Sequence, residues 1–290
     1  YKLYPLHLLP RYVNLPLANI FQMAHNKLVN IDGKTLIIGG INLFDFGFLN
    51  RDAMLKVEGP TAFYMAKRMN QDWNLEGEKT ELVPLEPFYP QPSSKSVWTR
   101  IIETSKEESS VKQAVINMIN SAKKSVYIAL LEFSDLDVID ALIEAKKRGV
   151  DIRVLMDRKA SDTNDKYSAG INFLVPSELP NIIPTVALYK ENIIVHYYDP
   201  PYQEQELHAK FCLVDNDRYI IGSTNFTVQA FNSWRETSIE VIGGDTPKQI
   251  KDFFLEDWNY HSSPCEKPTL GTYFKAYITE FFDKNYYGWW

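Results

Sequence analysis

The chain has 290 residues, of which 45% are hydrophobic and 23% charged, and this balance is typical of a soluble globular protein rather than a disordered one. Its formal net charge of −6 argues against a general nucleic-acid-binding protein, because such proteins usually carry an excess of basic residues. No apolar run approaches the roughly 18–20 residues that a membrane-spanning helix requires. Because the chain begins at Tyr1 rather than Met, the lack of a visible signal peptide carries no information.

The first part of the chain predicts an extended lead-in, a β-hairpin, a strand and a helix. Residues 1–20 contain three prolines and show no clear period. The runs 21–29 and 35–40 are of β type, and the Asp-Gly pair between them is a strong hairpin signal. Alternation over 53–58 predicts a further strand, and the apolar spacing over 61–73 predicts a helix.

Residues 76–104 predict a Pro-rich linker between two halves, since four prolines between positions 84 and 92 lie among polar side chains. The segment that follows alternates helices and strands: a helix capped by Ser109 or Ser110, a strand at 125–133, a helix at 135–148 and a strand at 151–157. Strand, helix and strand of these lengths form a βαβ unit, so we expect parallel strands with helices on the faces of the sheet.

Residues 158–185 predict a long irregular connection, which in a compact domain usually serves a function such as a wall or lid. The rest of the pattern predicts strands at 186–189, 193–198, 207–214, 219–222 and 238–242, and a helix at 247–260. The aromatic-rich tail, residues 263–290, has two interpretations. It is either a packed C-terminal element or a membrane-interface anchor, because Trp and Tyr favour that zone.

Two short stretches of the chain are nearly identical in spacing. In each, Lys follows His by two positions and Asp by seven, a pair of small residues comes at 14 and 15, and Asn comes at 17. The two copies are His25, Lys27, Asp32, Gly39-Gly40 and Asn42, and His208, Lys210, Asp215, Gly222-Ser223 and Asn225. The likeness extends over residues 25–59 and 208–244 and into a following helix, which indicates an internal repeat.

The His-x-Lys pairs indicate a phosphoryl-binding pocket. On a strand, His25 with Lys27 and His208 with Lys210 each place an imidazole beside an ammonium group on one face. If the two copies face each other across a pseudo-twofold axis, both pairs surround a single pocket. There the lysines neutralise phosphoryl oxygens, one His attacks phosphorus and the other protonates the leaving alcohol.

The other repeated polar residues have predicted roles around the same pocket. Asn42 and Asn225 follow small pairs that let the backbone approach closely, and their amides are expected to donate to the phosphoryl oxygens. Asp32 and Asp215 lie at turns, so their predicted role is structural, through turn hydrogen bonds.

Acidic residues occupy matching places further along each copy. Asp52 lies 27 residues after His25, and Glu236 lies 28 residues after His208. We expect each carboxylate to hydrogen-bond the His of its own copy, fixing the tautomer and stabilising imidazolium. The arginines that directly precede these acids, at 51 and 235, are interpreted as salt bridges rather than rim contacts.

The duplicated His-x-Lys-x4-Asp, with its following Gly-Gly or Gly-Ser pair and Asn, resembles the motif of the phospholipase D superfamily. Gly149–Asp157 resembles a further strand of that family, as do the acids Asp52 and Glu236 after each Asn. The resemblance covers roughly residues 20–75 and 105–260. Within the family, the Gly-Gly form of the first motif followed by Glu58-Gly59-Pro60 is similar to lipid-acting members, including bacterial phospholipase D and the cardiolipin synthases.

The resemblance implies an α/β fold, a two-lobed α/β/α sandwich with a pseudo-twofold repeat. It also implies a metal-independent reaction without a cofactor, in which His25 is the nucleophile of a covalent phosphohistidine and His208 the general acid and base. Family members carry a helix–strand–helix–strand block before the first motif, and this chain offers only about 20 residues there.

The predicted domains are therefore the C-terminal part of a first lobe at 1–75, apparently truncated at its N-terminus, the linker at 76–104, a complete second lobe at 105–262 and the tail at 263–290. The truncated lobe would leave an open sheet edge, so we expect a cleaved N-terminal fragment of the same precursor to stay bound as a separate chain.

The leading functional hypothesis is an enzyme that cleaves phospholipid phosphodiesters, by hydrolysis or by transfer to an alcohol. The alternatives are a metal-independent phosphodiester nuclease of the same superfamily and a non-enzymatic binding lobe. The expected partners are a phospholipid substrate and a membrane surface, with no strong nucleic-acid signal. A secreted, periplasmic or membrane-associated location is favoured over a plain cytoplasmic one.

Overall fold

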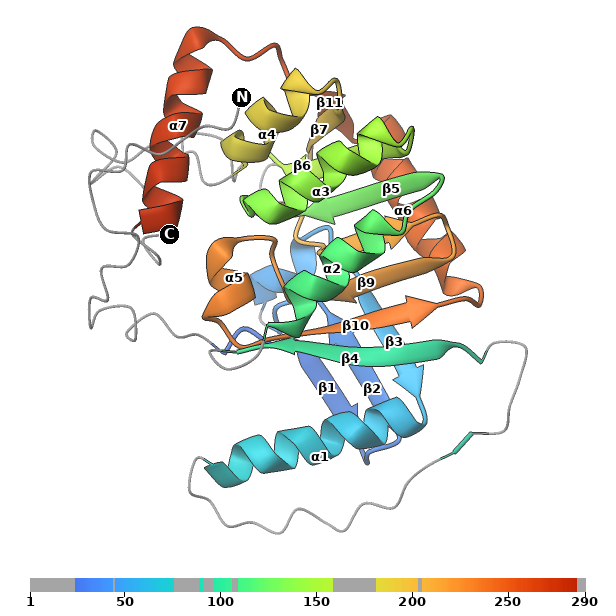
Figure 1. The fold of residues 1–290 in the computed structure, drawn as a ribbon. Helices are drawn as coiled ribbons and strands as arrows, with labels where there is room; N and C mark the ends of the chain where they lie inside the picture. The colour runs from blue at the N-terminus through green and yellow to red at the C-terminus, as the bar shows by residue number, and fades with distance from the viewer. Residues whose placement is uncertain are drawn as a thin grey trace.

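The computed structural model describes residues 24–43, 45–75, 89–90, 96–105, 109–158, 181–202 and 205–285, and it contains two β-sheets with helices packed around them (Figure 1). The predicted lead-in, most of the linker and most of the connection at 158–185 lie outside the described residues. Among the described residues, none of the helices combines the length and the apolar character needed to cross a bilayer.

The large sheet has eight strands in the order β11-β7-β6-β5-β8-β9-β10-β4. Its strands are β4 (Trp98–Thr104), β5 (Ser125–Leu130), β6 (Asp151–Asp157), β7 (Ile194–Tyr198), β8 (Phe211–Val214), β9 (Arg218–Gly222), β10 (Glu236–Ile242) and β11 (Ser262–Pro264). Strands β5, β6 and β7 run parallel, and the other neighbouring pairs run antiparallel. The βαβ unit formed by β5, α3 (Leu136–Lys147) and β6 is as the sequence predicted, and the α/β fold class is confirmed.

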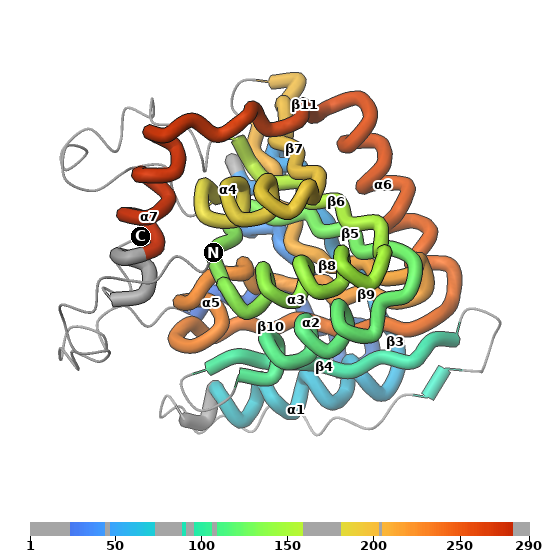
Figure 2. The backbone as a smooth tube through the Cα atoms, turned by 45° about the horizontal axis from the view of Figure 1, so that its top comes forward, coloured from blue at the N-terminus to red at the C-terminus, as the bar shows by residue number. Residues whose placement is uncertain are grey.

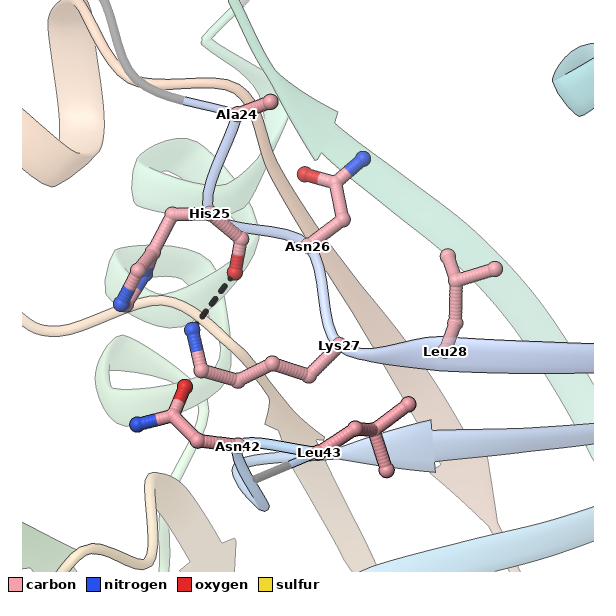
Figure 3. A pocket seen from close by; sticks show the side chains of 7 residues that line it. All are labelled: Ala24, His25, Asn26, Lys27, Leu28, Asn42 and Leu43. Atoms are coloured by element: carbon pink, nitrogen blue, oxygen red, sulfur yellow. Dashed lines mark hydrogen bonds between the residues drawn. The ribbon is translucent and has the colours of Figure 1, made fainter. Parts of the chain in front are cut away.

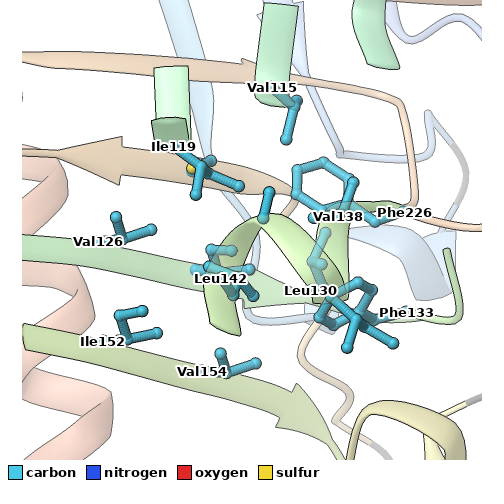
Figure 4. Close-up of a cluster of buried hydrophobic side chains, with 14 of the residues drawn as sticks. Val115, Ile119, Val126, Leu130, Phe133, Val138, Leu142, Ile152, Val154 and Phe226 are labelled. Carbon is cyan, nitrogen blue, oxygen red and sulfur yellow. The ribbon is translucent and has the colours of Figure 1, made fainter. Parts of the chain in front are cut away.

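Two hydrophobic cores cover the two faces of the large sheet. On one face lie α2 (Ser110–Asn120), α3 and α4 (Ile182–Lys190), which stand in a row in Figure 2. Figure 4 shows how Val115 and Ile119 of α2 and Leu142 of α3 meet Val126 and Ile152 of the sheet. On the other face lie α6 (Thr246–Tyr260) and the small sheet, with Leu36 and Ile38 fully buried. Alternate strand residues thus bury both faces, as expected of a sheet covered on both sides.

The small sheet repeats one part of the large sheet. Strands β1 (Leu28–Ile31), β2 (Thr35–Gly39) and β3 (Met54–Glu58) pair antiparallel in order and lead into helix α1 (Pro60–Leu75). Strands β8, β9 and β10 pair in the same way and lead into α6. The equivalent turns also match, because Asp32 and Asp215 both have φ of 54°. The internal repeat is therefore a repeat of structure, from the turn to the following helix.

The two copies differ at their first strand. Strand β8 pairs with β5 on its second edge, whereas β1 pairs only with β2 among the described residues. At the turn after β8, the Asp215 carboxylate accepts backbone N–H groups from Lys123, Lys124 and Ser125 at 2.7–3.1 Å. This bonding joins the second copy to the segment that precedes it in the sequence.

Two sequence predictions about the elements are wrong. Residues 186–189 were predicted as a strand, but they belong to helix α4, whose residues are buried on nearly every side. A helix without a polar face has no 3.6-residue pattern to distinguish it from a buried strand, and Pro184 fits because it lies in the first turn. Residues 98–104, placed in the linker, form the edge strand β4 paired with β10.

The aromatic tail is mostly helix α7 (Leu270–Asn285). Ala276 is buried in the first core and Tyr273 packs against it, while Phe274 is exposed. These contacts favour the packed C-terminal element, and the interface-anchor interpretation stays a prediction.

Replacing Asp215 by Asn should lower the free energy of unfolding by about 1–2 kcal/mol, because the backbone N–H groups at 123–125 lose a charged acceptor. Asp32→Asn is the matched control, since Asp32 is exposed and Asn tolerates the same positive φ. Burial opposes ionisation of Asp215, but the backbone N–H groups and Arg218 lower its pKa below the ordinary value. Its contribution is therefore present at neutral pH and is lost as the pH falls through that lowered pKa. Urea unfolding at pH 7 and pH 3 measures both effects, and equal losses in the two variants would contradict the assignment.

Candidate active site

The two repeated motifs meet at one site between the copies. His25 and Lys27 directly precede β1, and His208 and Lys210 directly precede β8. These segments are extended but lie just outside the strand ladders in which they were predicted. Their backbone is nevertheless tied to the hairpins, because Gly39 N donates to Lys27 O and Gly222 N donates to Lys210 O. The two His-x-Lys pairs therefore keep the positions that the sequence analysis expected of strand residues.

A pocket of about 240 Å³ opens at the first motif (Figure 3). It is lined by Ala24, His25, Asn26, Lys27, Leu28, Asn42 and Leu43. In Figure 3 the Lys27 ammonium group and the Asn42 amide lie side by side with the His25 ring. Asn42 Nδ2 also lies 3.4 Å from His208 Nε2, so residues of both copies share the site.

Both motif lysines are buried and fold back onto their own histidines. Lys27 Nζ donates to His25 O at 2.8 Å, and Lys210 Nζ donates to His208 O at 2.6 Å. Burial lowers the pKa of Lys27 to about 8, with a further contribution from Lys210, and burial also lowers the pKa of Lys210 to about 8. At pH 7 both groups are charged, but each gives up its proton more readily than an exposed lysine.

The histidine–carboxylate pairs cross between the copies. His25 Nδ1 lies 2.8 Å from Glu236 Oε1, and His208 Nδ1 lies 2.7 Å from Asp52 Oδ2. The prediction that each acid bonds the His of its own copy is therefore wrong. Spacing along the chain gives the place of each acid within its copy, but the packing of one copy against the other decides which imidazole it meets.

The backbone shows how this crossing arises. His208 N and Ala209 N both donate to Arg51 O, and His25 N donates to Arg235 O. Each segment that carries an acid thus runs beside the histidine segment of the opposite copy. A carboxylate at Nδ1 holds the proton on that nitrogen, so Nε2 of each ring is the atom available for chemistry.

The environments of the two imidazoles differ. The His25 side chain is 17% exposed, whereas that of His208 is only 6% exposed. Burial, reinforced by Lys210, lowers the pKa of His208 to about 4 in spite of the hydrogen bond to Asp52. His208 is therefore neutral at pH 7, and its Nε2 accepts from the Asn42 amide.

The small pairs of the motif lie against the acids, a role that the sequence analysis did not predict. A Cβ on Gly40 would lie 2.2 Å from Asp52 Oδ1 and 2.8 Å from His208 O, so a larger residue would displace this carboxylate. In the second copy Ser223 stands at that place and donates its hydroxyl to Glu236 Oε2. The two acids are thus held by different partners.

The two motif asparagines do not have equivalent contacts. Asn42 lines the pocket, whereas Asn225 donates to Glu132 Oε2 at 3.1 Å. Glu132 was missed by the sequence analysis, although its place just after β5 is a signal that could have indicated it. Gly47, in the 3₁₀ turn η2 (Asp45–Leu49), was also missed. A Cβ there would lie 2.3 Å from Asn42 O, so this turn packs directly on the backbone of Asn42.

Asp32 and Asp215 lie at turns and not in the pocket, in agreement with a structural role. Over the described ranges, no cluster of three or more His, Cys, Asp or Glu side chains is arranged to hold a metal ion.

The sequence is similar to those of proteins named cardiolipin synthase. Residues 115–258 match the family model described as the phospholipase D-like domain of cardiolipin synthase. The chain is 29% identical over 258 residues to the cardiolipin synthase of Listeria welshimeri, which covers 84% of this chain and 50% of that protein. It is 25% identical over 257 residues to cardiolipin synthase 2 of Staphylococcus epidermidis, covering 84% of this chain and 49% of that protein. The chain thus spans about half the length of these relatives.

Among solved structures, the crystal structure of phosphatidylserine synthase from Haemophilus influenzae Rd KW20 matches with a TM-score of 0.64 and 11% identity. The match covers 85% of this chain and 63% of the other chain. At this level of identity the similarity shows a shared fold.

The crossed pairs predict that each acid controls the imidazole of the opposite copy. Asp52→Asn should lower the pKa of His208 further, by roughly one unit, because a negative charge that favours imidazolium is lost. His25 should be unaffected, and Glu236→Gln should perturb His25 but leave His208 unaffected. The imidazole ¹⁵N signals, assigned with His25→Gln and His208→Gln variants, measure both effects. A response within the same copy would contradict the crossed arrangement.

Proposed function

We propose that this chain, which belongs to the phospholipase D superfamily, cleaves phospholipid phosphodiesters and passes the phosphatidyl group to water or to an alcohol. The observation that carries the proposal is the site itself, in which two imidazoles, each held at Nδ1 by a carboxylate, meet two buried lysines. Such a set supplies a nucleophile, a proton donor and cationic groups for a phosphoryl oxygen. The names of the relatives, cardiolipin synthase above all, support a phospholipid substrate.

In the proposed first step, His25 Nε2 attacks phosphorus and the bond from phosphorus to the leaving alcohol breaks. His208 donates its Nε2 proton to the departing oxygen, and the phosphatidyl group is left on His25. In the second step His208 takes a proton from water or an acceptor alcohol, whose oxygen attacks phosphorus and displaces His25. Glu236 stabilises the positive charge that develops on His25, through its 2.8 Å contact with Nδ1.

The proton on His208 has to be acquired with the substrate. In the free protein burial and Lys210 lower the pKa of His208 to about 4, so the ring is neutral at pH 7. An anionic phosphodiester beside the ring raises this pKa, since an opposite charge favours imidazolium. The substrate would thus help to charge the acid that protonates its leaving group.

Lys27, Lys210 and Asn42 are the proposed ligands of the non-bridging oxygens. The same role for Asn225 requires its amide to turn from Glu132, to which it donates in the free protein. Asp32 and Asp215 keep a structural role outside the pocket. Contact with a membrane surface, and a membrane-associated, periplasmic or secreted location, follow from the substrate class and belong to the same proposal.

The reverse assignment of the two imidazoles has one observation in its favour. His208 is neutral in the free protein, and its Nε2 lone pair faces the Asn42 amide at 3.4 Å. A neutral ring with an available lone pair is the state that a nucleophile requires.

Incubation of the purified protein with vesicles containing phosphatidylglycerol or phosphatidylcholine should release head group or form a new phosphatidyl ester. His25→Ala and His208→Ala should each lower the rate by roughly 10³-fold or more, because each removes a group that acts on the reacting atoms. Lys34→Ala, at an exposed lysine after the first turn, is the control that should retain full activity. Chromatography of the labelled lipid products gives the rates.

Rapid acid quenching of the same reactions identifies the nucleophile by peptide mapping of the labelled histidine. Label on His25 is expected, and label on His208 would support the reverse assignment. If the intact protein leaves both lipids unchanged but cleaves single-stranded DNA, the nuclease alternative replaces the lipid proposal.

We also propose that an N-terminal fragment binds to the first copy, where apolar side chains are exposed whose equivalents in the second copy are buried. Phe226 and Phe231 of the second copy are 2% and 0% exposed, in the core formed with α2 and α3. Leu43 and Phe48, at the equivalent positions of the first copy, are 60% and 63% exposed, and among the described residues β1 pairs only with β2. A segment that pairs with β1 as β5 pairs with β8 would cover both side chains.

Native mass spectrometry of the protein purified from its source should therefore find a second polypeptide. Hydroxyl-radical labelling should show Leu43 and Phe48 protected in that complex. A single polypeptide with both side chains fully labelled would contradict the fragment.

A further inference from the structure

Arg51 and Arg235, which directly precede the two catalytic acids, both reach across to the opposite copy. Arg51 Nε donates to both carboxylate oxygens of Asp257 on α6 at 2.9 Å. A second nitrogen of Arg51 donates to Glu256 at 2.8 Å, and the guanidinium group lies 4.0 Å from the centre of the Phe253 ring. The arginine of the first copy is therefore fixed on the last helix of the second.

The same contact exists in the other direction. Arg235 of the second copy donates to Asp72 on α1 of the first copy at 2.5 Å. Asp72 and Asp257 occupy equivalent places, each in the helix that follows the third strand of its copy. The two ion pairs are thus related by the repeat, as the two histidine–acid pairs are.

Each arginine also holds the opposite histidine segment through its main chain. Arg51 O accepts from His208 N at 2.9 Å and from Ala209 N at 3.1 Å, and Arg51 N donates to Glu206 O at 2.8 Å. Arg235 O accepts from His25 N at 2.9 Å. The residue that follows each arginine then supplies the carboxylate for that same histidine. One arginine–acid dipeptide therefore binds a helix, a backbone segment and an imidazole of the opposite copy.

We infer that Arg51 and Arg235 are positioning residues, which hold each carboxylate on the imidazole of the opposite copy and so couple the two halves of the site. Neither guanidinium lines the pocket at the first motif, so both act through the neighbouring acid. The inference deepens the proposed function and rests on it for its kinetic test, but not for its spectroscopic test.

We expect substitution of Arg51 and substitution of Arg235 to disturb the histidine–carboxylate pairs to different extents. The Asp257 side chain is fully buried and Arg51 is 27% exposed, whereas Asp72 and Arg235 are 25% and 30% exposed. Exposed ion pairs contribute little, but removing one partner of a buried pair leaves a buried charge without compensation. Arg51, and with it the His208–Asp52 pair, should therefore be the more sensitive of the two.

The test compares Arg51→Lys, Arg51→Gln, Arg235→Lys and Arg235→Gln with the wild type. Lysine keeps the charge but lacks the planar guanidinium, whose Nε meets Asp257 while a second nitrogen meets Glu256. Arg51→Lys should lower kcat by roughly 10–100-fold with KM changed less than about 3-fold, because the acid and imidazole are misplaced while the substrate ligands remain. Arg51→Gln should have a lower kcat than Arg51→Lys, and the Arg235 variants should show a smaller loss of kcat.

Arg100→Gln is the matched control. Arg100 pairs with Glu240 at 2.6 Å between β4 and β10, but it does not adjoin a catalytic acid. Thermal unfolding shows whether each variant is folded. If a glutamine variant is not folded, the lysine variant at the same position provides the test.

The imidazole ¹⁵N signals give the decisive readout, because they do not require activity. Arg51→Lys should perturb His208 and spare His25, Arg235→Lys should do the opposite, and Arg100→Gln should perturb neither. The inference is overturned if the lysine variants leave both imidazoles and kcat as in the wild type, or if they change both imidazoles alike. Absence of activity in the wild type, with these selective shifts intact, would reject the proposed function and retain the positioning role.

Discussion

The hydrogen bonds from His25 to Glu236 and from His208 to Asp52 constrain the whole molecule, because each joins one copy of the repeat to the other. Neither copy alone holds the acid that orients its own histidine. The short segments before β3 and β10 must therefore lie beside the histidine segments of the opposite copy, which the bonds to Arg51 O and Arg235 O achieve. Gly40 also allows Asp52 to reach His208, since a Cβ at that position would collide with the Asp52 carboxylate.

The same arrangement brings the positive charges of the two lysines close to the negative charges of the two carboxylates. Lys27 and Lys210 are buried close enough for each to disfavour the positive charge of its neighbours, and the carboxylates of Asp52 and Glu236 oppose this effect. A phosphodiester anion would complete the compensation, because it brings negative charge to the buried ammonium groups. The proposed substrate therefore supplies electrostatic stabilisation that the free site lacks.

The sequence predicted which residues lie together at the candidate site, but it predicted the packing around them less well. Fixed spacing identified both His-x-Lys pairs, Asn42 and the two acids, because a repeat preserves local register. The crossing of His25 to Glu236 depends on contacts between residues 211 positions apart, which no spacing within one copy can encode. Helix α4 was missed for a related reason, since its burial comes from tertiary packing and removes the amphipathic pattern. Strand β4 lies in a Pro-rich context, and its partner β10 follows more than a hundred residues later.

The repeated scaffold gives the two imidazoles unequal surroundings, and in the proposed reaction they have different tasks. His25 is partly exposed beside Trp234, and its acid is bound by Ser223, whereas His208 is buried beside Lys210, and its acid lies against Gly40. Displacement at phosphorus needs one imidazole that keeps a free lone pair and another that carries a proton, so strict symmetry would be a disadvantage. The pseudo-twofold arrangement brings the groups together, but their surroundings depart from it. Burial and Lys210 lower the pKa of His208, Ser223 stands where the first copy has Gly40, and Asn225 bonds Glu132 whereas Asn42 lines the pocket. In the proposed reaction the division between nucleophile and acid thus depends on the local surroundings and not on the His-x-Lys-x4-Asp pattern, which is the same in both copies.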